Sequence, residues 1–283
     1  MWRDARMSAV LGQEHAGRAR AEAAQLYALR ACLSVRESGA VAYPRGRDRG
    51  GDGKDGFRGL IALEPAFLPL LANPLVLPTV VALLGANLHL LSSHLIALPP
   101  LAAGAPRRIR TPERHGWHRD IYRAAHDLGD YQVPRMALKC AYYLTDVGDP
   151  CSGMTMFLPG SHRRREPLRV PPGQIDPPGA VTPRVGPQDA VLFENRTWHA
   201  GGVNSCGRVR LAVMLHYGYR WLARVDDPYD ETLASAALDP VSRQLLGEPD
   251  RNPDGSFAKG RGARAIDAWW QQLATSPERI PGA

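Results

Sequence analysis

Apolar residues gather in short runs through the middle of the chain, and Gly/Pro-rich turns separate these runs. The run over residues 135–145 is the clearest strand in the sequence. Further strands are predicted over residues 87–97, 154–158, 190–194 and 210–217, each of them bounded by turn-forming residues. Many short strands with such turns indicate a β-barrel or a jelly roll.

Helical patterns flank the predicted strands. Residues 13–38 have the Ala-rich, amphipathic spacing of a helix, and residues 64–84 predict short helices that are broken by proline and end at Gly85. A last helix is predicted over residues 266–273. Residues 44–59 hold many glycines and charges and little to bury, so we expect a mobile loop or a disordered insertion there.

The chain of 283 residues shows no internal repeat and no clean linker, which predicts a single domain. We divide it into a helical N-terminal part (1–86), a β core (about 87–220) and a C-terminal helical extension (221–283). The fold class is therefore mainly β with flanking helices. An apolar content of 44% with 22% charged residues is that of an ordinary globular protein.

Residues 66–105 contain no Asp, Glu, Lys or Arg, which raises the question of a membrane span. Pro69, Pro74 and Pro78 would break such a helix, so we expect two short buried helices and a strand. The charged N-terminus argues against a signal peptide. The four cysteines show neither a zinc spacing nor a disulfide framework, and Cys140 reads as a buried thiol. These features favour a cytoplasmic location without membrane contact.

The formal net charge is +7, and arginine carries nearly all of the positive charge. A basic protein can bind nucleic acid or anionic small molecules. Because no aromatic platform and no nucleic-acid reader motif is present, we do not expect a nucleic-acid partner. The Arg-rich loops at residues 107–114 and 163–165 suit an anionic substrate, a CoA ester or a carrier-protein arm, or are simply solvated surface.

The sequence Trp117-His118-Arg119-Asp120 carries the strongest chemical signal. In an extended segment residues i and i+2 point to the same face, so His118 and Asp120 can reach one metal ion. A third ligand, His199, follows an apolar strand further along the chain. Two histidines and one carboxylate on one face are typical of non-haem Fe(II) oxygenases. His115 and His126 are rival ligands with less support.

Together with Pro159-Gly160-Ser161-His162 and with Arg210 eleven residues after His199, this motif resembles the phytanoyl-CoA dioxygenase-like Fe(II)/2-oxoglutarate-dependent oxygenases. The resemblance covers about residues 60–219 and implies a double-stranded β-helix, a cupin-like jelly roll. It implies that His118, Asp120 and His199 bind Fe(II), and that Arg210 pairs with the distal carboxylate of 2-oxoglutarate. Tyr142 is expected near the cosubstrate.

The activity that the resemblance implies is a dioxygenase reaction in which O₂ and 2-oxoglutarate drive oxidation of an unactivated C–H bond in a small molecule. Hydroxylation is the leading outcome, with epimerisation, desaturation and ring closure open, and a tailoring step in secondary metabolism, such as antibiotic biosynthesis, is the expected setting. Asp120 argues against chlorination, because halogenating relatives lack this carboxylate. The alternatives are a non-catalytic ligand-binding barrel and a 2-oxoglutarate-independent cupin-type metalloprotein.

The residues beside the proposed ligands are candidates for the substrate pocket, although tryptophan next to a metal can equally be a packing wall. The polar, Pro-rich residues 163–184 are long enough to act as a lid. The pocket candidates are Trp117, Ile121, Tyr122, Trp198 and His94.

Overall fold

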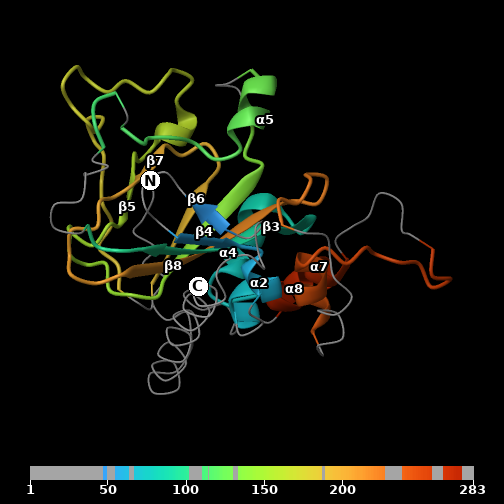
Figure 1. The fold of residues 1–283 in the computed structure, drawn as a ribbon. Coiled ribbons are helices and arrows are strands. Elements are labelled where there is room, and N and C mark those ends of the chain that lie inside the picture. The colour runs from blue at the N-terminus through green and yellow to red at the C-terminus, as the bar shows by residue number, and fades with distance from the viewer. Residues whose placement is uncertain are drawn as a thin grey trace.

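The computed structural model describes residues 47–49, 55–63, 67–101, 110–113, 115–129, 133–186, 189–226, 238–256 and 264–275. The helix predicted over residues 13–38 lies outside these ranges. Within them, two antiparallel β-sheets enclose the candidate site, and helices cover the outer face of the larger sheet (Figure 1).

The larger sheet has six strands, and each neighbouring pair is antiparallel. At its centre β3 and β8 pair along almost their whole length, with one irregularity between Leu90 and Ser92. In spatial order the strands are β1 (Arg47–Arg49), β2 (Asp55–Arg58), β3 (Leu88–Leu98), β8 (Arg210–Tyr219), β4 (Ala137–Tyr143) and β6 (Ala190–Glu194).

The smaller sheet pairs β5 (Thr155–Phe157) with β7 (His199–Gly201). Two single bridges extend it, because His118 pairs with His199 on one side and Val181 pairs with Phe157 on the other. The segment that carries the first predicted metal ligand therefore forms the edge of this sheet. The two sheets together form the jelly roll that the sequence predicts.

Side chains alternate between the two faces of the larger sheet, as the pleat requires. Leu138, Cys140 and Tyr142 of β4 point to the helices, and this face is continuous with the largest apolar core. Ala141 and Tyr143 point to the inside of the jelly roll, where they belong to a second, smaller core. The helices on the outer face are α2 (Leu60–Leu63), α3 (Leu68–Leu71), α4 (Leu77–Leu84), α7 (Pro240–Leu245) and α8 (Arg264–Thr275) (Figure 1).

Two short helices lie outside this layer. The helix α5 (Tyr122–Asp127) follows the metal segment, which is residues 117–120 with the predicted ligands His118 and Asp120. The 3₁₀ turn η2 (Ser161–Arg163) follows the Pro-Gly turn after β5. Gly160 at the start of η2 has φ 77°, a left-handed conformation that glycine adopts without steric cost. The turn brings the Ser161 hydroxyl to the Trp198 backbone N–H, which donates to it at 2.9 Å, and so fastens the approach to His199.

The strands predicted for the core are all present within two residues of their expected bounds. Helices also form within residues 68–84 and over residues 264–275, where the sequence predicts them. The described part of residues 66–105, which is 67–101, forms two helices and a strand as predicted. No helix within the described ranges is long and apolar enough to cross a membrane.

Two predictions were wrong. Residues 47–49 and 55–58 form the edge strands β1 and β2 rather than a mobile loop or a disordered insertion, so the part predicted as helical also contributes to the larger sheet. Cys151 and Cys206 form a disulfide between the loop after β4 and the loop before β8. Cys140, by contrast, is the buried free thiol that the sequence predicts.

Candidate metal and cosubstrate site

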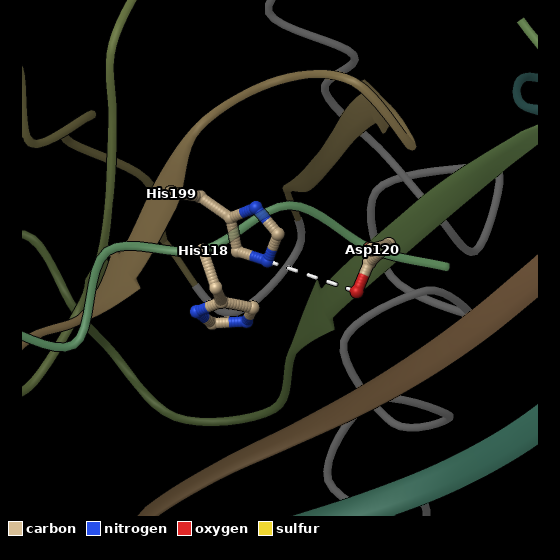
Figure 2. Close-up of side chains that lie close together, drawn as sticks. All are labelled: His118, Asp120 and His199. Atoms are coloured by element: carbon tan, nitrogen blue, oxygen red, sulfur yellow. Dashed lines mark ion pairs between the residues drawn. The ribbon is translucent and has the colours of Figure 1, made fainter. Parts of the chain in front are cut away.

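Backbone pairing places the two histidines side by side. The His118 N–H donates to the His199 carbonyl at 2.9 Å, and the His199 N–H donates to the His118 carbonyl at 3.0 Å. Their imidazole ring centroids consequently lie 4.2 Å apart. Asp120, two residues further along the same segment, points its carboxylate to the same place (Figure 2).

The three predicted ligands converge. One ligand atom from each of His118, Asp120 and His199 lies within 4.8 Å of the other two. The Nε2 atom of His199 is 3.9 Å from Oδ1 of Asp120 (Figure 2). The structure thus brings together residues that are 79 positions apart in the sequence, in the arrangement that the motif spacing predicts.

The backbone also sets the tautomer of both imidazoles. Nδ1 of His118 lies 2.9 Å from the Gly116 carbonyl, and Nδ1 of His199 lies 2.9 Å from the Thr197 carbonyl. A carbonyl can only accept, so each Nδ1 carries the proton and each Nε2 keeps its lone pair for a metal ion.

The charges of the site favour metal binding at neutral pH. Burial lowers the pKa of His199 to about 3, so its imidazole is neutral. Burial alone would raise the pKa of Asp120, but the neighbouring Lys139 ammonium outweighs it, and the pKa of this carboxyl lies well below its usual range. Metal ligands must be deprotonated, and both of these groups already are.

A second observation indicates that the three predicted ligands fit a metal ion. Oδ2 of Asp120 is buried and accepts no hydrogen bond from any described residue, which is costly unless a cation lies against it. Two neutral imidazole nitrogens and one carboxylate suit Fe(II) better than the all-oxygen set of Ca²⁺ or the closed sulfur-rich set of structural zinc. His118, Asp120 and His199 would hold this ion.

A cavity of about 1010 Å³ opens in front of the metal ligands. His118 and His199 line it, and so does Arg210 from the first position of β8. The cavity has a strongly basic wall, since Arg58, Arg110, Lys139 and Arg210 face it, and among the described lining residues Glu113 alone carries a carboxylate.

Arg210 enters this cavity from a buried position. Its side chain is only 6% exposed, whereas Arg208 and Val209 before it are exposed. The guanidinium lies 5.9 Å from the centroid of the Tyr143 ring, and the Tyr143 hydroxyl donates to Oγ1 of Thr155 at 2.9 Å. A guanidinium held on an aromatic face inside a cavity is suited to bind a carboxylate through two parallel hydrogen bonds.

Tyr142 does not lie where the prediction put it. Its side chain points to the helix-covered face of β4, and its hydroxyl donates to the Leu70 carbonyl at 3.1 Å. Neighbouring residues in a strand point to opposite faces, so Tyr143, and not Tyr142, lies against Arg210 inside the jelly roll.

Of the five residues predicted for the substrate pocket, His94 lines the cavity. Trp117 and Trp198 alternate with the histidine ligands and point the other way: Trp117 packs against Leu158 and donates from Nε1 to Asp176 at 2.9 Å, and Trp198 stacks on Arg119.

The other two candidates lie beyond Asp120. Ile121 turns away and packs against Val133 and Met136, and Tyr122 is 69% exposed on α5. The turn is sharp because Ile121 has φ 55°, a left-handed conformation that strains a β-branched residue.

The sequence prediction missed several residues of this site. Lys139 donates from Nζ to Oδ1 of Asp120 at 2.7 Å, and Phe193 packs its ring 4.7 Å from that of His199. A lone lysine inside an apolar strand was the available signal for the first. Arg58 reaches the cavity because β2 pairs with β3 and places it opposite His94.

Arg110 ties the predicted lid to the metal segment. Its Nη2 lies 2.5 Å from Oδ1 of Asp176, and its Nε donates to the His115 carbonyl at 2.6 Å. Trp117 donates to the same oxygen of Asp176. The predicted lid, residues 163–184, is therefore anchored near its middle, at Asp176, next to the cavity.

A jelly roll with two histidines and one carboxylate inside it, and an arginine at the start of the last core strand, defines the class of non-haem iron and 2-oxoglutarate-dependent oxygenases. The chain belongs to the phytanoyl-CoA dioxygenase (PhyH) family, whose sequence model matches residues 47–212. This confirms the resemblance inferred from the motifs. No functionally curated protein matches the chain.

Solved structures with the same fold have low sequence identity to this chain. The non-haem monooxygenase ThoJ in complex with nickel is 18% identical over 97% of this chain and 93% of its own, with a TM-score of 0.55. EctD from S. alaskensis with 2-oxoglutarate and 5-hydroxyectoine is 20% identical over 71% and 68%, with a TM-score of 0.52. AviO1 from Streptomyces viridochromogenes Tue57 is 22% identical over 75% and 87%, with a TM-score of 0.50.

Proposed function

We propose that this protein is an Fe(II)- and 2-oxoglutarate-dependent dioxygenase that hydroxylates an unactivated C–H bond of an anionic small molecule, as a tailoring step in secondary metabolism. One observation carries the proposal. The ligand atoms of His118, Asp120 and His199 converge within 4.8 Å, and the two histidines line the same cavity as the buried Arg210. A metal-binding group and a carboxylate-binding group in one cavity are the two requirements for use of 2-oxoglutarate.

Each residue has a separate task. His118 and His199 offer Nε2, and Asp120 offers its carboxylate, to an iron ion that supplies the activation of O₂ when it is bound. Arg210 binds the distal carboxylate of 2-oxoglutarate through two N–H donors, and Tyr143 and Thr155 hold that guanidinium in place. The Phe193 ring covers one side of His199 and keeps water from it.

The basic wall favours an anionic substrate. Arg58 and Arg110 line the cavity in addition to Lys139 and Arg210, and Glu113 is the single carboxylate among the lining residues that the structure describes. A cavity of about 1010 Å³ has room for a drug-sized molecule beside the cosubstrate. A CoA-linked or carrier-linked form of such a substrate stays a prediction. Asp120 occupies the ligand position that a chloride would need, so we propose a hydroxylase and not a halogenase.

An anaerobic titration tests the proposal directly. Fe(II) and then 2-oxoglutarate are added to the metal-free protein, and the weak visible charge-transfer band of the iron–2-oxoglutarate chelate is recorded. We expect a band in the wild type, no band in His199→Ala, and a large loss of 2-oxoglutarate affinity in Arg210→Ala. The matched controls are His126→Ala on the exposed side of α5 and Arg208→Ala, which is exposed two residues before Arg210.

The results separate the proposed function from its alternatives. No band in folded wild-type protein would favour the non-catalytic barrel. If the protein binds the metal but Arg210→Ala and the wild type have the same 2-oxoglutarate affinity, the result would favour a 2-oxoglutarate-independent cupin. Once a band is found, O₂ consumption is screened with small carboxylates and phosphates, and with their CoA and carrier-linked forms. Arg58→Ala and Arg110→Ala are expected to raise KM for an anionic substrate more than they lower kcat.

A further inference from the structure

A row of side chains crosses the inner face of the larger sheet behind the metal ligands. The strand register places Ser92 opposite His216, His216 opposite Lys139, and Lys139 opposite Phe193. All four side chains point to the inside of the jelly roll. Ser92, Lys139 and Phe193 line the cavity themselves, and His216 lies two residues after Met214, which also lines it. Within this row Phe193 packs on the metal ligand candidate His199, and Lys139 donates a hydrogen bond to Asp120.

Lys139 is fixed in this position from three sides. Its Nζ donates to Oδ1 of Asp120 at 2.7 Å, and the ammonium lies 5.9 Å from the centroid of the Phe193 ring. Its side chain is 21% exposed, and that exposed part lies in the cavity wall. His216 on its other side is buried, and burial lowers the pKa of this histidine to about 4, so it is neutral and does not compete for the carboxylate.

We infer that Lys139 is a positioning residue: its ammonium holds Oδ1 of Asp120, the oxygen that lies 3.9 Å from Nε2 of His199, and so keeps the carboxylate from binding the metal ion with both oxygens. The inference rests on the proposed function and deepens it. The two oxygens of Asp120 are indeed unequal, because Oδ1 accepts from Lys139 whereas Oδ2 is buried without a hydrogen bond from any described residue. A carboxylate that binds with one oxygen leaves one more coordination position for 2-oxoglutarate and O₂ than a carboxylate that binds with both.

The ammonium also changes the charge of the site. A divalent cation on Asp120 would lie within a few ångströms of Lys139, and like charges at such a distance repel strongly in a partly buried site. The wild-type site therefore binds the metal less tightly than its ligands alone would allow. In return, the same ammonium faces the cavity that receives a doubly negative cosubstrate.

Substitution of Lys139 is consequently expected to move two affinities in opposite directions. In Lys139→Met, Ni²⁺ should bind at least about tenfold more tightly, because the repelling charge is gone. The affinity of the iron-loaded protein for 2-oxoglutarate should fall by about tenfold, because Asp120 is free to bind with both oxygens and a cation has been lost. Lys139→Arg keeps the charge and a donor, so both affinities should stay within about threefold of the wild type.

Isothermal titration with Ni²⁺ at pH 7.5 and the anaerobic charge-transfer titration measure the two affinities, and thermal unfolding is recorded in parallel. Arg135→Met is the matched control, since it removes a cation that donates at 2.7 Å to a different buried carboxylate, Glu194. It should lower Tm and leave both affinities unchanged. A structural defect weakens both affinities together, so opposite movement in Lys139→Met supports the positioning role.

The inference is overturned if Lys139→Met binds Ni²⁺ and 2-oxoglutarate as the wild type does, or if both affinities fall in step with Tm. Such results would leave the proposed function intact, because the wild-type protein would still bind both ligands. Failure of the proposed function has a different signature, which is the lack of a charge-transfer band in the folded wild-type protein itself.

Discussion

Tyr142 and Tyr143 are neighbours in β4, yet their hydroxyls end on opposite sides of the sheet. Tyr142 donates to the Leu70 carbonyl under the helices, and Tyr143 donates to Thr155 inside the jelly roll. Both side chains are about 1% exposed, so burial alone does not separate them. Only the Tyr143 ring lies against the guanidinium of Arg210. The two residues therefore form a matched pair for testing the cosubstrate end of the cavity.

We predict that Tyr142→Phe and Tyr143→Phe each lower the free energy of unfolding by about 1 kcal/mol, since each loses one buried hydrogen bond. Only Tyr143→Phe should also weaken 2-oxoglutarate binding, by about two- to fivefold, because its ring is then no longer held under Arg210. Urea unfolding and the anaerobic titration give the two quantities. Equal 2-oxoglutarate affinity in both variants would contradict the assignment of Tyr143.

The strand β4 also shows which features of the fold can be predicted from the sequence and which cannot. Its position was predictable from a run of apolar residues, but a strand buried on both faces has no polar alternation to tell its faces apart. The one exception is Lys139, and counting by two from it reaches Ala141 and Tyr143 on the cavity side. The prediction of Tyr142 failed because it followed the family resemblance and not this alternation.

The metal ligands were predictable for the opposite reason. His118 and Asp120 are linked by a local i, i+2 rule, which needs no knowledge of the fold. Arg58 and the Cys151–Cys206 pair depend instead on contacts between distant segments: β2 must pair with β3, and two loops 55 residues apart must meet. Local composition predicts neither, and the Gly-rich sequence around β2 even favoured disorder.

Asp176 anchors the residues between η2 and β6, because it accepts from both Arg110 and Trp117. We predict that Asp176→Asn speeds amide hydrogen exchange over residues 171–181 by about two- to fivefold, as expected for loss of a half-exposed ion pair. Asp189→Asn is the control, since this carboxylate caps the Gly186 N–H at the other end of the segment. Exchange that is unchanged in Asp176→Asn would show that the segment is held by other contacts.

The buried histidines predict an acid-sensitive metal-free protein. Burial lowers the pKa of His216 to about 4 and that of His199 to about 3. As the pH falls below 6.5, the unfolded chain takes up these protons before the folded protein does, so stability falls with pH down to about 4. Each of the two histidines contributes a slope of about 1.4 kcal/mol per pH unit in this window.

Urea unfolding in EDTA between pH 7 and pH 4.5 measures this slope. His216→Gln should reduce it by about 1.4 kcal/mol per pH unit, because glutamine takes up no proton in this range. The carboxylate of Asp120 and the ammonium of Lys139 lie near His216 in both proteins, so their contributions cancel in the comparison. A wild-type protein whose stability is the same at pH 7 and pH 4.5 would contradict the burial of these imidazoles.

The disulfide between Cys151 and Cys206 joins the loop after β4 to the loop before β8, and the second of these loops forms part of the cavity wall. Gly202, Val203 and Asn204 of that wall lie within four residues of Cys206, and the Cys206 N–H donates back to the Cys151 carbonyl at 3.2 Å. A cross-link over 55 residues restricts the unfolded chain and stabilises the fold by roughly 4 kcal/mol in the loop-entropy account. Gly202 sits against the Met154 backbone, so this wall has little room to shift.

We therefore predict that dithiothreitol lowers the urea midpoint of the wild-type protein, and that the double variant Cys151→Ser/Cys206→Ser has the same lowered midpoint with or without the reductant. Cys140→Ser is the control for thiol effects, because Cys140 is buried in the helix-facing core and forms no disulfide. It should remain sensitive to dithiothreitol. A wild-type midpoint that dithiothreitol does not change would mean that the two thiols do not pair in solution, and that backbone hydrogen bonds alone hold this wall.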